Sequence, residues 1–308
     1  DRTQLRNPNL KLNWQATPKD MVSFLYFDGF KIKDNRSPGT AGITFDAPTA
    51  TFHQDNAYTD NPLHGLFKIA DDRVIGPNMF VTAKYAYFNT GFLLTPEGGM
   101  ALSSGRDLPL ATSYGSTVQS LNVRPQMTVN VDLNSFLSGL GASHDVKYGV
   151  GWRRVNATTA TLWPGNGILA LAQTPTTLFA QLFREGRGTN HTSYADLYVG
   201  DTISKGRATF DLGVRYDRQG GRALPSATAA NPAFPALVPG LIFAGYDAPF
   251  TWNNISPRAG LTYALDESRK TVLRGSYARF AGQLDSASVG YMNPTSSAGV
   301  AVYRWLDL

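Results

Sequence analysis

Apolar and polar side chains alternate with a period of two along several stretches of the chain. Residues 127–134 read MTVNVDLN, in which every odd-numbered residue is apolar and every even-numbered residue is polar. The same alternation runs through residues 146–153 and 209–217. Because successive side chains of a strand point to opposite faces, each stretch predicts a β-strand with one apolar and one polar face.

Weaker copies of the pattern extend it over most of the chain. They occupy residues 10–16, 22–27, 81–87, 258–263, 273–278 and 298–305. With their partners across the intervening turns, these stretches predict roughly 11 strands in all. The last of them, 298–305, is expected to be a further strand of the same sheet.

The connections between the predicted strands fall into two length classes. The short ones, rich in Gly, Pro, Asp, Asn or Ser, lie at 17–20, 71–78, 135–143, 204–207 and 265–270. The long ones lie at 34–63, 89–125, 156–189, 218–253 and 281–297. Short turns that alternate with long loops predict an antiparallel up-and-down sheet with all short turns at one end.

This asymmetry favours an all-β transmembrane barrel with short periplasmic turns and long extracellular loops. Lipid supplies no hydrogen bonds, so strands can cross it only in a closed barrel, with apolar side chains outward and polar ones inward. A soluble β-rich binding protein explains the alternation equally well and stays an alternative. It does not explain the loop asymmetry, or glycines such as Gly149 and Gly151 on a face that would have to fill a core.

Composition removes several classes of protein. The chain has no cysteine, which excludes disulfide scaffolds, cysteine-ligated metals and thiol nucleophiles. It has no apolar run long enough for a transmembrane helix. The net charge is 28 − 23 = +5, but the basic residues are scattered, so we expect no nucleic-acid partner. Metal-binding and nucleophile motifs are missing, so we expect neither an enzyme nor a cofactor.

Three segments resemble the barrel of TonB-dependent outer-membrane receptors. In 254–280, NISPRAGLTYA leads through a turn to TVLRGSYARF. Residues 194–217 and 143–149 resemble strands of the same family. The sequence is closest to the Oar-like branch of that family. The resemblance implies a barrel of about 22 strands with a plugged lumen, in the outer membrane of a Gram-negative bacterium. It also implies uptake of a solute with energy delivered through TonB.

On this resemblance, residues 1–308 are expected to be one barrel segment, with the plug domain and the C-terminal strands outside it. The partners expected are outer-membrane lipid, the plug domain of the same receptor, and the TonB complex through an N-terminal region that the segment lacks. An unidentified solute or surface partner completes the set. The sequence does not identify the solute.

Two groups of residues are candidates for function. The first is predicted to line the lumen, where it contacts a plug or an anionic solute, or pairs internally as charges on lumen walls often do. It consists of Lys147, Arg153, Arg215, Arg258, Arg274, Asp132 and Asp211. The second lies in the proline-rich loop 231–250, whose exposed apolar side chains predict a contact surface, unless the loop folds onto its neighbours. It consists of Phe234, Leu241, Phe243 and Tyr246.

A second function fits the same pattern. An outer-membrane adhesin or surface-assembly protein would use the long loops to bind other macromolecules and would transport no solute. Loop length alone does not separate it from a transporter.

Overall fold

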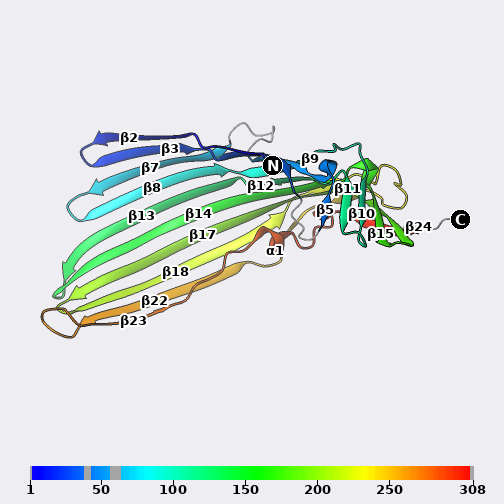
Figure 1. The fold of residues 1–308 in the computed structure, drawn as a ribbon. Helices are drawn as coiled ribbons and strands as arrows, with labels where there is room; N and C mark the ends of the chain where they lie inside the picture. Colours follow the sequence, from blue (N-terminus) through cyan, green and yellow to red (C-terminus); the bar gives the residue numbers. More distant parts are fainter. Residues whose placement is uncertain (1, 38–42, 56–63, 306–308) are drawn as a thin grey trace.

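A curved antiparallel sheet forms most of the molecule (Figure 1). The computed structural model describes residues 2–37, 43–55 and 64–305. Within them, one 16-stranded sheet contains a long wall and its shorter extensions. The wall strands, in spatial order, are β2 (Asn9–Thr17), β3 (Asp20–Phe27), β7 (Gly65–Ile75), β8 (Met79–Asn89), β13 (Gln126–Gly139), β14 (Ala142–Leu162), β17 (Gly186–Lys205), β18 (Ala208–Ala223), β22 (Trp252–Ala264) and β23 (Val272–Ala278).

Sequence neighbours pair in the wall, as an up-and-down sheet requires, and every pairing in it is antiparallel. Among the described residues β2 pairs only with β3, and β23 only with β22, so the wall is an open, curved part of a barrel. The extensions are β1 (Arg2–Arg6), β4 (Phe30–Arg36), β6 (Thr51–Asp55), β9 (Gly91–Pro96), β12 (Gln119–Val123) and β21 (Tyr246–Asp247).

The strand register aligns the apolar residues that alternate in the sequence. Val131 lies opposite Val150, Val150 opposite Leu197, and Leu197 opposite Tyr216. This row belongs to what we call the apolar face, and the intervening positions form the polar face. The apolar face is uncovered, with Val150 56% and Leu197 53% exposed.

Large apolar side chains are rarely buried anywhere in the described part of the chain. The fully buried ones are Leu284 and Val289, and neither lies in the wall. A soluble sheet with a dry face would bury that face against a second layer. The structure therefore disagrees with the soluble alternative. No helix in the described residues is long and apolar enough to cross a membrane.

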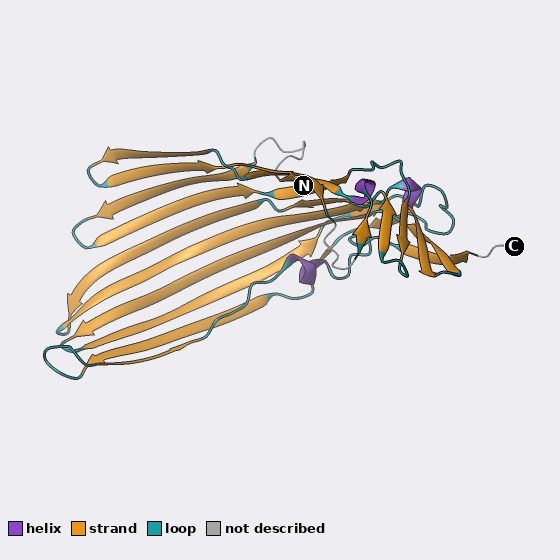
Figure 2. Ribbon diagram, viewed as in Figure 1, coloured by secondary structure: helices purple, strands orange, loops and turns teal. Residues whose placement is uncertain are grey.

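The short turns lie together at one end of the wall, called the turn end, as predicted (Figure 2). They are tighter than the sequence suggested, because strands extend into the predicted connections. Between β13 and β14 the turn is only Leu140–Gly141, although 135–143 was predicted to be a connection. Both residues have a positive φ, 52° and 70°, as a two-residue type I′ hairpin requires.

Leucine is poorly suited to that turn, so Leu140→Asn is expected to stabilise the protein by about 1 kcal/mol, because asparagine tolerates a positive φ and leucine does not. Leu140 is 94% exposed, so its side chain gives up no packing. Urea unfolding of the purified protein measures the gain. Leu137→Asn, the same change within strand β13, is the control and should not stabilise; a gain in both variants would contradict the turn argument.

The turn between β22 and β23 is held by one carboxylate. Asp266 accepts hydrogen bonds from the Ser268 hydroxyl (2.6 Å), the Lys270 amide (3.0 Å) and the Thr271 amide (2.7 Å). The Ser268 hydrogen bond, followed by the two amides, lowers the pKa of Asp266 below its ordinary value of 3.8.

Acidification is therefore expected to spare this turn over most of the pH range. A lowered folded pKa means that the carboxylate stabilises the turn fully above pH 3.8 and loses this effect only as pH falls through the lower folded value. Amide exchange at Thr271 between pH 3 and pH 7, corrected for intrinsic rates, measures it. Asp266→Asn should remove the protection at every pH. Loss of protection already near pH 5 in the unsubstituted protein would contradict the assignment.

The opposite end, called the loop end, carries structure of its own (Figure 2). The predicted long loops fold into a mixed six-stranded sheet in the order β24 (Val300–Trp305), β16 (Thr177–Phe183), β15 (Ile168–Thr174), β10 (Ser104–Asp107), β11 (Thr112–Gly115) and β5 (Thr44–Phe45). A smaller sheet pairs β19 (Ser226–Thr228) with β20 (Leu241–Phe243). Helices η1 (Ala47–Thr49), η2 (Gly165–Gly167) and α1 (Ser286–Gly290) lie between these strands.

One predicted wall strand belongs to this second sheet. The pattern at 298–305 does form a strand, β24, but it pairs with β16 at the loop end and not with the wall. The described wall therefore has the ten strands named above and not 11. The predicted alternation was right for this segment, whereas its place in the fold was wrong, because alternation does not specify a partner strand.

Candidate functional site

The polar face of the wall gathers the charged side chains. Directly paired residues share a face, and one row runs from Asp132 through Gly149 and Tyr198 to Arg215. By the same register the remaining predicted lumen residues lie on this face too: Lys147, Arg153, Asp211, Arg258 and Arg274.

Glycines leave the space that these side chains occupy. A Cβ on Gly149 would lie 2.9 Å from the Tyr198 ring and 3.1 Å from the Asp132 carboxylate. A Cβ on Gly151 would overlap the carboxylate of Asp196. The two glycines of β14 thus keep the polar face low, as their position in the sequence suggested.

The centre of the face is an ionic network, called here the polar-face cluster. Arg215 lies 3.3 Å from Asp196 through Nη2 and 2.8 Å from Asp217 through Nε. The carboxylates are only 16% and 15% exposed, whereas Arg215 is 50% exposed. Asp132 accepts from Lys84 (3.2 Å) and from the Tyr198 hydroxyl (2.9 Å).

Three of the other predicted residues of the face have polar or aromatic partners among the described residues, and two do not. Arg153 stacks over the Tyr194 ring at 4.1 Å, Lys147 lies 3.5 Å from Asp145, and Asp211 accepts from Thr202 at 2.8 Å. Arg258 lies against Gly200 and Gly213, and Arg274 is exposed opposite Thr262. Sequence reasoning omitted Asp196, Tyr194 and Tyr198, all on β17.

The segment that follows β23 leaves the edge strand and lies against this face. After β23 the chain runs along the wall to α1, which Figure 1 shows close to the loop ends of β17 and β18. Leu284 and Val289 are completely buried there. The Leu284 amide donates to Gln219 Oε1 (2.7 Å), and its carbonyl accepts from the Tyr194 hydroxyl (2.5 Å). We call residues 279–295 the folded-back segment.

A cavity of about 550 Å³ lies between the folded-back segment and the polar-face cluster. Its walls include Arg153, Asp196 and Arg215 from the wall, with Arg279 and Gln283 from the segment. Cationic donors and carboxylate acceptors both line it. Such a lining can hold a polar group of either charge by hydrogen bonds and ion pairs.

The predicted loop contact residues do not form one patch. Phe243 and Tyr246 meet edge to face with centroids 5.9 Å apart, and the Tyr246 hydroxyl donates to the Val289 carbonyl (2.5 Å). Leu241 pairs with Thr228 in the small sheet, whereas Phe234 is 43% exposed. The loop therefore folds onto its neighbours, the second of the two arrangements considered from the sequence.

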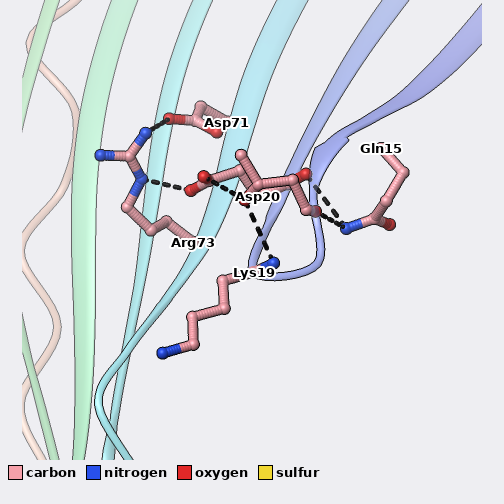
Figure 3. Close-up of polar contacts among 6 residues, drawn as sticks. Gln15, Lys19, Asp20, Asp71 and Arg73 are labelled. Atoms are coloured by element: carbon pink, nitrogen blue, oxygen red, sulfur yellow. Dashed lines mark hydrogen bonds and ion pairs between the residues drawn. The ribbon is translucent and has the colours of Figure 1, made fainter.

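A further ionic cluster lies on the apolar face at the turn end (Figure 3). Asp20 forms an ion pair with Arg73, which is 3.9 Å from Asp71, and Gln15 donates to the Asp20 carbonyl at 3.1 Å. On the same face, beyond the intervening strands β8 and β13, His144 Nδ1 lies 2.7 Å from Asp201. Charged side chains thus occur on the apolar face close to the turns. Nowhere in the described residues do three His, Asp or Glu side chains gather as metal ligands.

Comparison with known proteins identifies the architecture. Residues 1–303 match the family model described as TonB dependent receptor-like, beta-barrel. The comparison with curated proteins gave no significant match. The match agrees with the family-level resemblance seen in the sequence, whereas the Oar-like branch stays a prediction.

Solved receptors share the fold. The ferric-catecholate import receptor Fiu of Escherichia coli K12 in its closed form aligns with a TM-score of 0.58 and 13% identity, over 93% of this chain and 46% of that one. Its open form gives 0.53 and 14%, over 89% and 52%. The siderophore receptor PiuA of Acinetobacter baumannii gives 0.51 and 13%, over 88% and 41%. The chain thus spans about half the length of the receptors it matches.

Proposed function

Because the chain belongs to the TonB-dependent receptor β-barrel family, whose members are transport receptors of the Gram-negative outer membrane, we propose that it forms part of the wall and the extracellular loops of a receptor that takes up a solute. In this proposal the apolar face contacts lipid and the polar face lines the lumen. The turn end is periplasmic and the loop end extracellular. Energy comes from TonB acting on a plug domain.

The dimensions of the apolar face carry this placement. On β14 the apolar face is free of charge between His144 and Arg154. Ten residues of strand are about 33 Å long, and a tilt near 40° reduces this to about 25 Å across the membrane. That is the height of the apolar band of outer-membrane barrels. Polar groups would enter the headgroup layers on both sides.

The polar-face cluster then faces the lumen, where family membership implies a plug. Its charges are largely paired within the wall, so it stays stable whether or not a solute is present. Arg215 and Arg279 border the cavity under the folded-back segment and offer donors to a passing anionic group. The solved relatives carry ferric-catecholate and siderophore in their names, and we include ferric siderophores in the solutes to be tested.

Spin labels test the two faces. With the receptor in bilayers, labels at Val129 and Val150 are expected to be accessible to oxygen, and labels at Asn130 and Lys147 to a water-soluble nickel chelate. Val129 and Asn130 are adjacent on β13, and Val150 and Lys147 lie three positions apart on β14, so in each pair the two labels lie on opposite faces and act as controls for each other. Equal nickel accessibility at all four positions would reject the barrel placement.

Uptake by whole cells tests transport. A strain that lacks the receptor gene should lose uptake of one solute among ferric siderophores, cobalamin, saccharides and peptides, and plasmid-borne receptor should restore it. Deletion of tonB should have the same effect. Unchanged uptake together with lost adhesion or surface assembly would favour the adhesin function instead.

A further inference from the structure

The apolar face changes character sharply at the loop end of β14, β17 and β18. On β18, Arg218, Gly220 and Arg222 occupy alternate positions, so all three lie on the apolar face. Across from Gly220 is Ser193 of β17, and across from Ser193 is Arg154 of β14. Three arginines therefore surround two of the smallest residues of the chain.

The small residues leave a hollow between the cations. A Cβ on Gly220 would meet only the Thr251 hydroxyl oxygen, at 3.7 Å. The hollow has a volume of about 380 Å³, and its lining includes Arg218, Arg222 and His191. The one acidic residue in its lining is Asp247. Asp247 lies opposite Arg222 in the strand register, but the two side chains are not within ion-pair distance.

These cations differ from those of the polar-face cluster because they have no counter-charge. Among the described residues, Arg154, Arg218 and Arg222 form no ion pair, whereas Arg215 has two. Arg154 Nε is buried and has no hydrogen-bond partner. Arg154 Nη2 lies 3.3 Å from His191 Nδ1, so one basic group borders another. An anion in the hollow would give Arg218 and Arg222, which line it, the ion-pair partner that they lack.

The position of the hollow identifies the anion's source. Trp152 lies at its lower border, and an aromatic residue at this level marks the membrane interface of a barrel. Below it, toward the turn end, Leu197 and Val150 are exposed on the same face. A ligand with a phosphate at the arginines would therefore lay hydrocarbon chains along these residues. Free phosphate would contact only the arginines and not the apolar residues Leu197 and Val150.

We propose that this hollow binds the phosphate group of a lipid of the outer leaflet. Arg218 and Arg222 hold the phosphate oxygens, since guanidinium groups bind phosphate in a bidentate manner. Gly220 and Ser193 provide the space for the headgroup. The acyl chains pack on Leu197 and Val150. The site lies on the outside of the barrel and is independent of the solute that the receptor transports.

Binding of lipid A to the full-length receptor tests the proposal. The receptor, purified in uncharged detergent, is mixed with bisphosphorylated lipid A or its dephosphorylated form, and native mass spectrometry measures the bound lipid. We expect the bisphosphorylated lipid to bind and the R218Q/R222Q variant to bind it roughly tenfold more weakly, because two charge-assisted contacts are lost. Gly220→Val fills the hollow without changing charge, and its expected loss is similar.

Arg304→Gln is the matched control, because Arg304 is an exposed arginine of β24, away from the hollow. It should bind lipid A as the unsubstituted receptor does. If R218Q/R222Q fails to fold, Gly220→Val carries the test. Equal binding of both lipid forms, or undiminished binding by Gly220→Val, would overturn the proposal. Complete competition by millimolar inorganic phosphate would assign the site to free phosphate and overturn the lipid.

Discussion

Leu284→Ala is expected to release the folded-back segment from the polar face. The leucine side chain is completely buried, and the Leu284 backbone is hydrogen-bonded to Tyr194 of β17 and Gln219 of β18. A Leu→Ala change at a buried site costs about 2–5 kcal/mol, and the described segment has only one other fully buried large apolar side chain, Val289. Its loss should leave the segment mostly detached, although the wall pairings do not depend on it.

Hydrogen exchange of the full-length receptor measures this release. Peptides covering 279–295 should exchange faster by about 1.5 to 3.5 orders of magnitude, as the lost free energy implies, while β17 and β18 keep their protection. Leu237→Ala, the same change at a loop residue that is 48% exposed, should leave exchange within about twofold. Uniformly faster exchange across the wall would mean that Leu284 stabilises the barrel as a whole, against this expectation.

The folded-back segment also shows where sequence reasoning ends. Residues 281–297 were predicted to be a long loop, and the structure agrees except for the short helix α1. The prediction did not include the packing of this loop on the wall. Leu284 and Val289 stand among polar residues and exposed apolar ones such as Tyr291 and Met292, with no repeating pattern that singles them out. The burial of Val289 depends on Gly221 of β18, whose missing side chain makes room for it. Two segments remote in sequence fit together here, and neither carries a local signal of it.

The wall, in contrast, was predictable because lipid imposes a strict rule on each strand separately. Every outward position within the hydrocarbon layer must be apolar, so the period of two is visible in strands such as 127–134 without knowledge of their partners. The polar face follows from the same alternation, which is why Asp132 and Arg215 could both be predicted to lie on it. Their actual partners, Tyr198 and Asp196, required the register between strands, which alternation does not contain.

The sheet at the loop end was missed for a related reason. Its strands are short, and two of its pairings, β10 with β15 and β5 with β11, are parallel and join segments far apart in the sequence. Ser104–Asp107 shows no alternation at all. Here burial is decided by neighbouring loops and not by a uniform solvent, so the side-chain pattern of a single strand is uninformative.

Asn231→Ala is expected to separate three of the loops that build this end. Asn231 is completely buried, and its Nδ2 donates to the carbonyls of Gly167 (3.1 Å) and Phe183 (2.8 Å). Its Oδ1 accepts from the amides of Ala233 (3.0 Å) and Phe234 (2.9 Å). Four hydrogen bonds at about 0.5–1.5 kcal/mol each suggest a local loss of about 2–6 kcal/mol. It should be seen as faster exchange in η2, at the end of β16 and in 231–238.

Asn231→Asp separates the hydrogen bonds from the volume of the side chain. Aspartate keeps the two acceptor bonds, but at neutral pH its charge would lie against the Gly167 and Phe183 carbonyl oxygens, so it should be at least as damaging as alanine. Burial without a cation raises the pKa of such a carboxyl, and protonation restores one donor. The loss in Asn231→Asp should therefore shrink as pH falls from 7 to 5, while the loss in Asn231→Ala stays constant. Asn9→Ala, at an exposed position of β2, should change neither. A pH-independent loss in the aspartate variant would show that Asn231 acts through its shape and not through its hydrogen bonds.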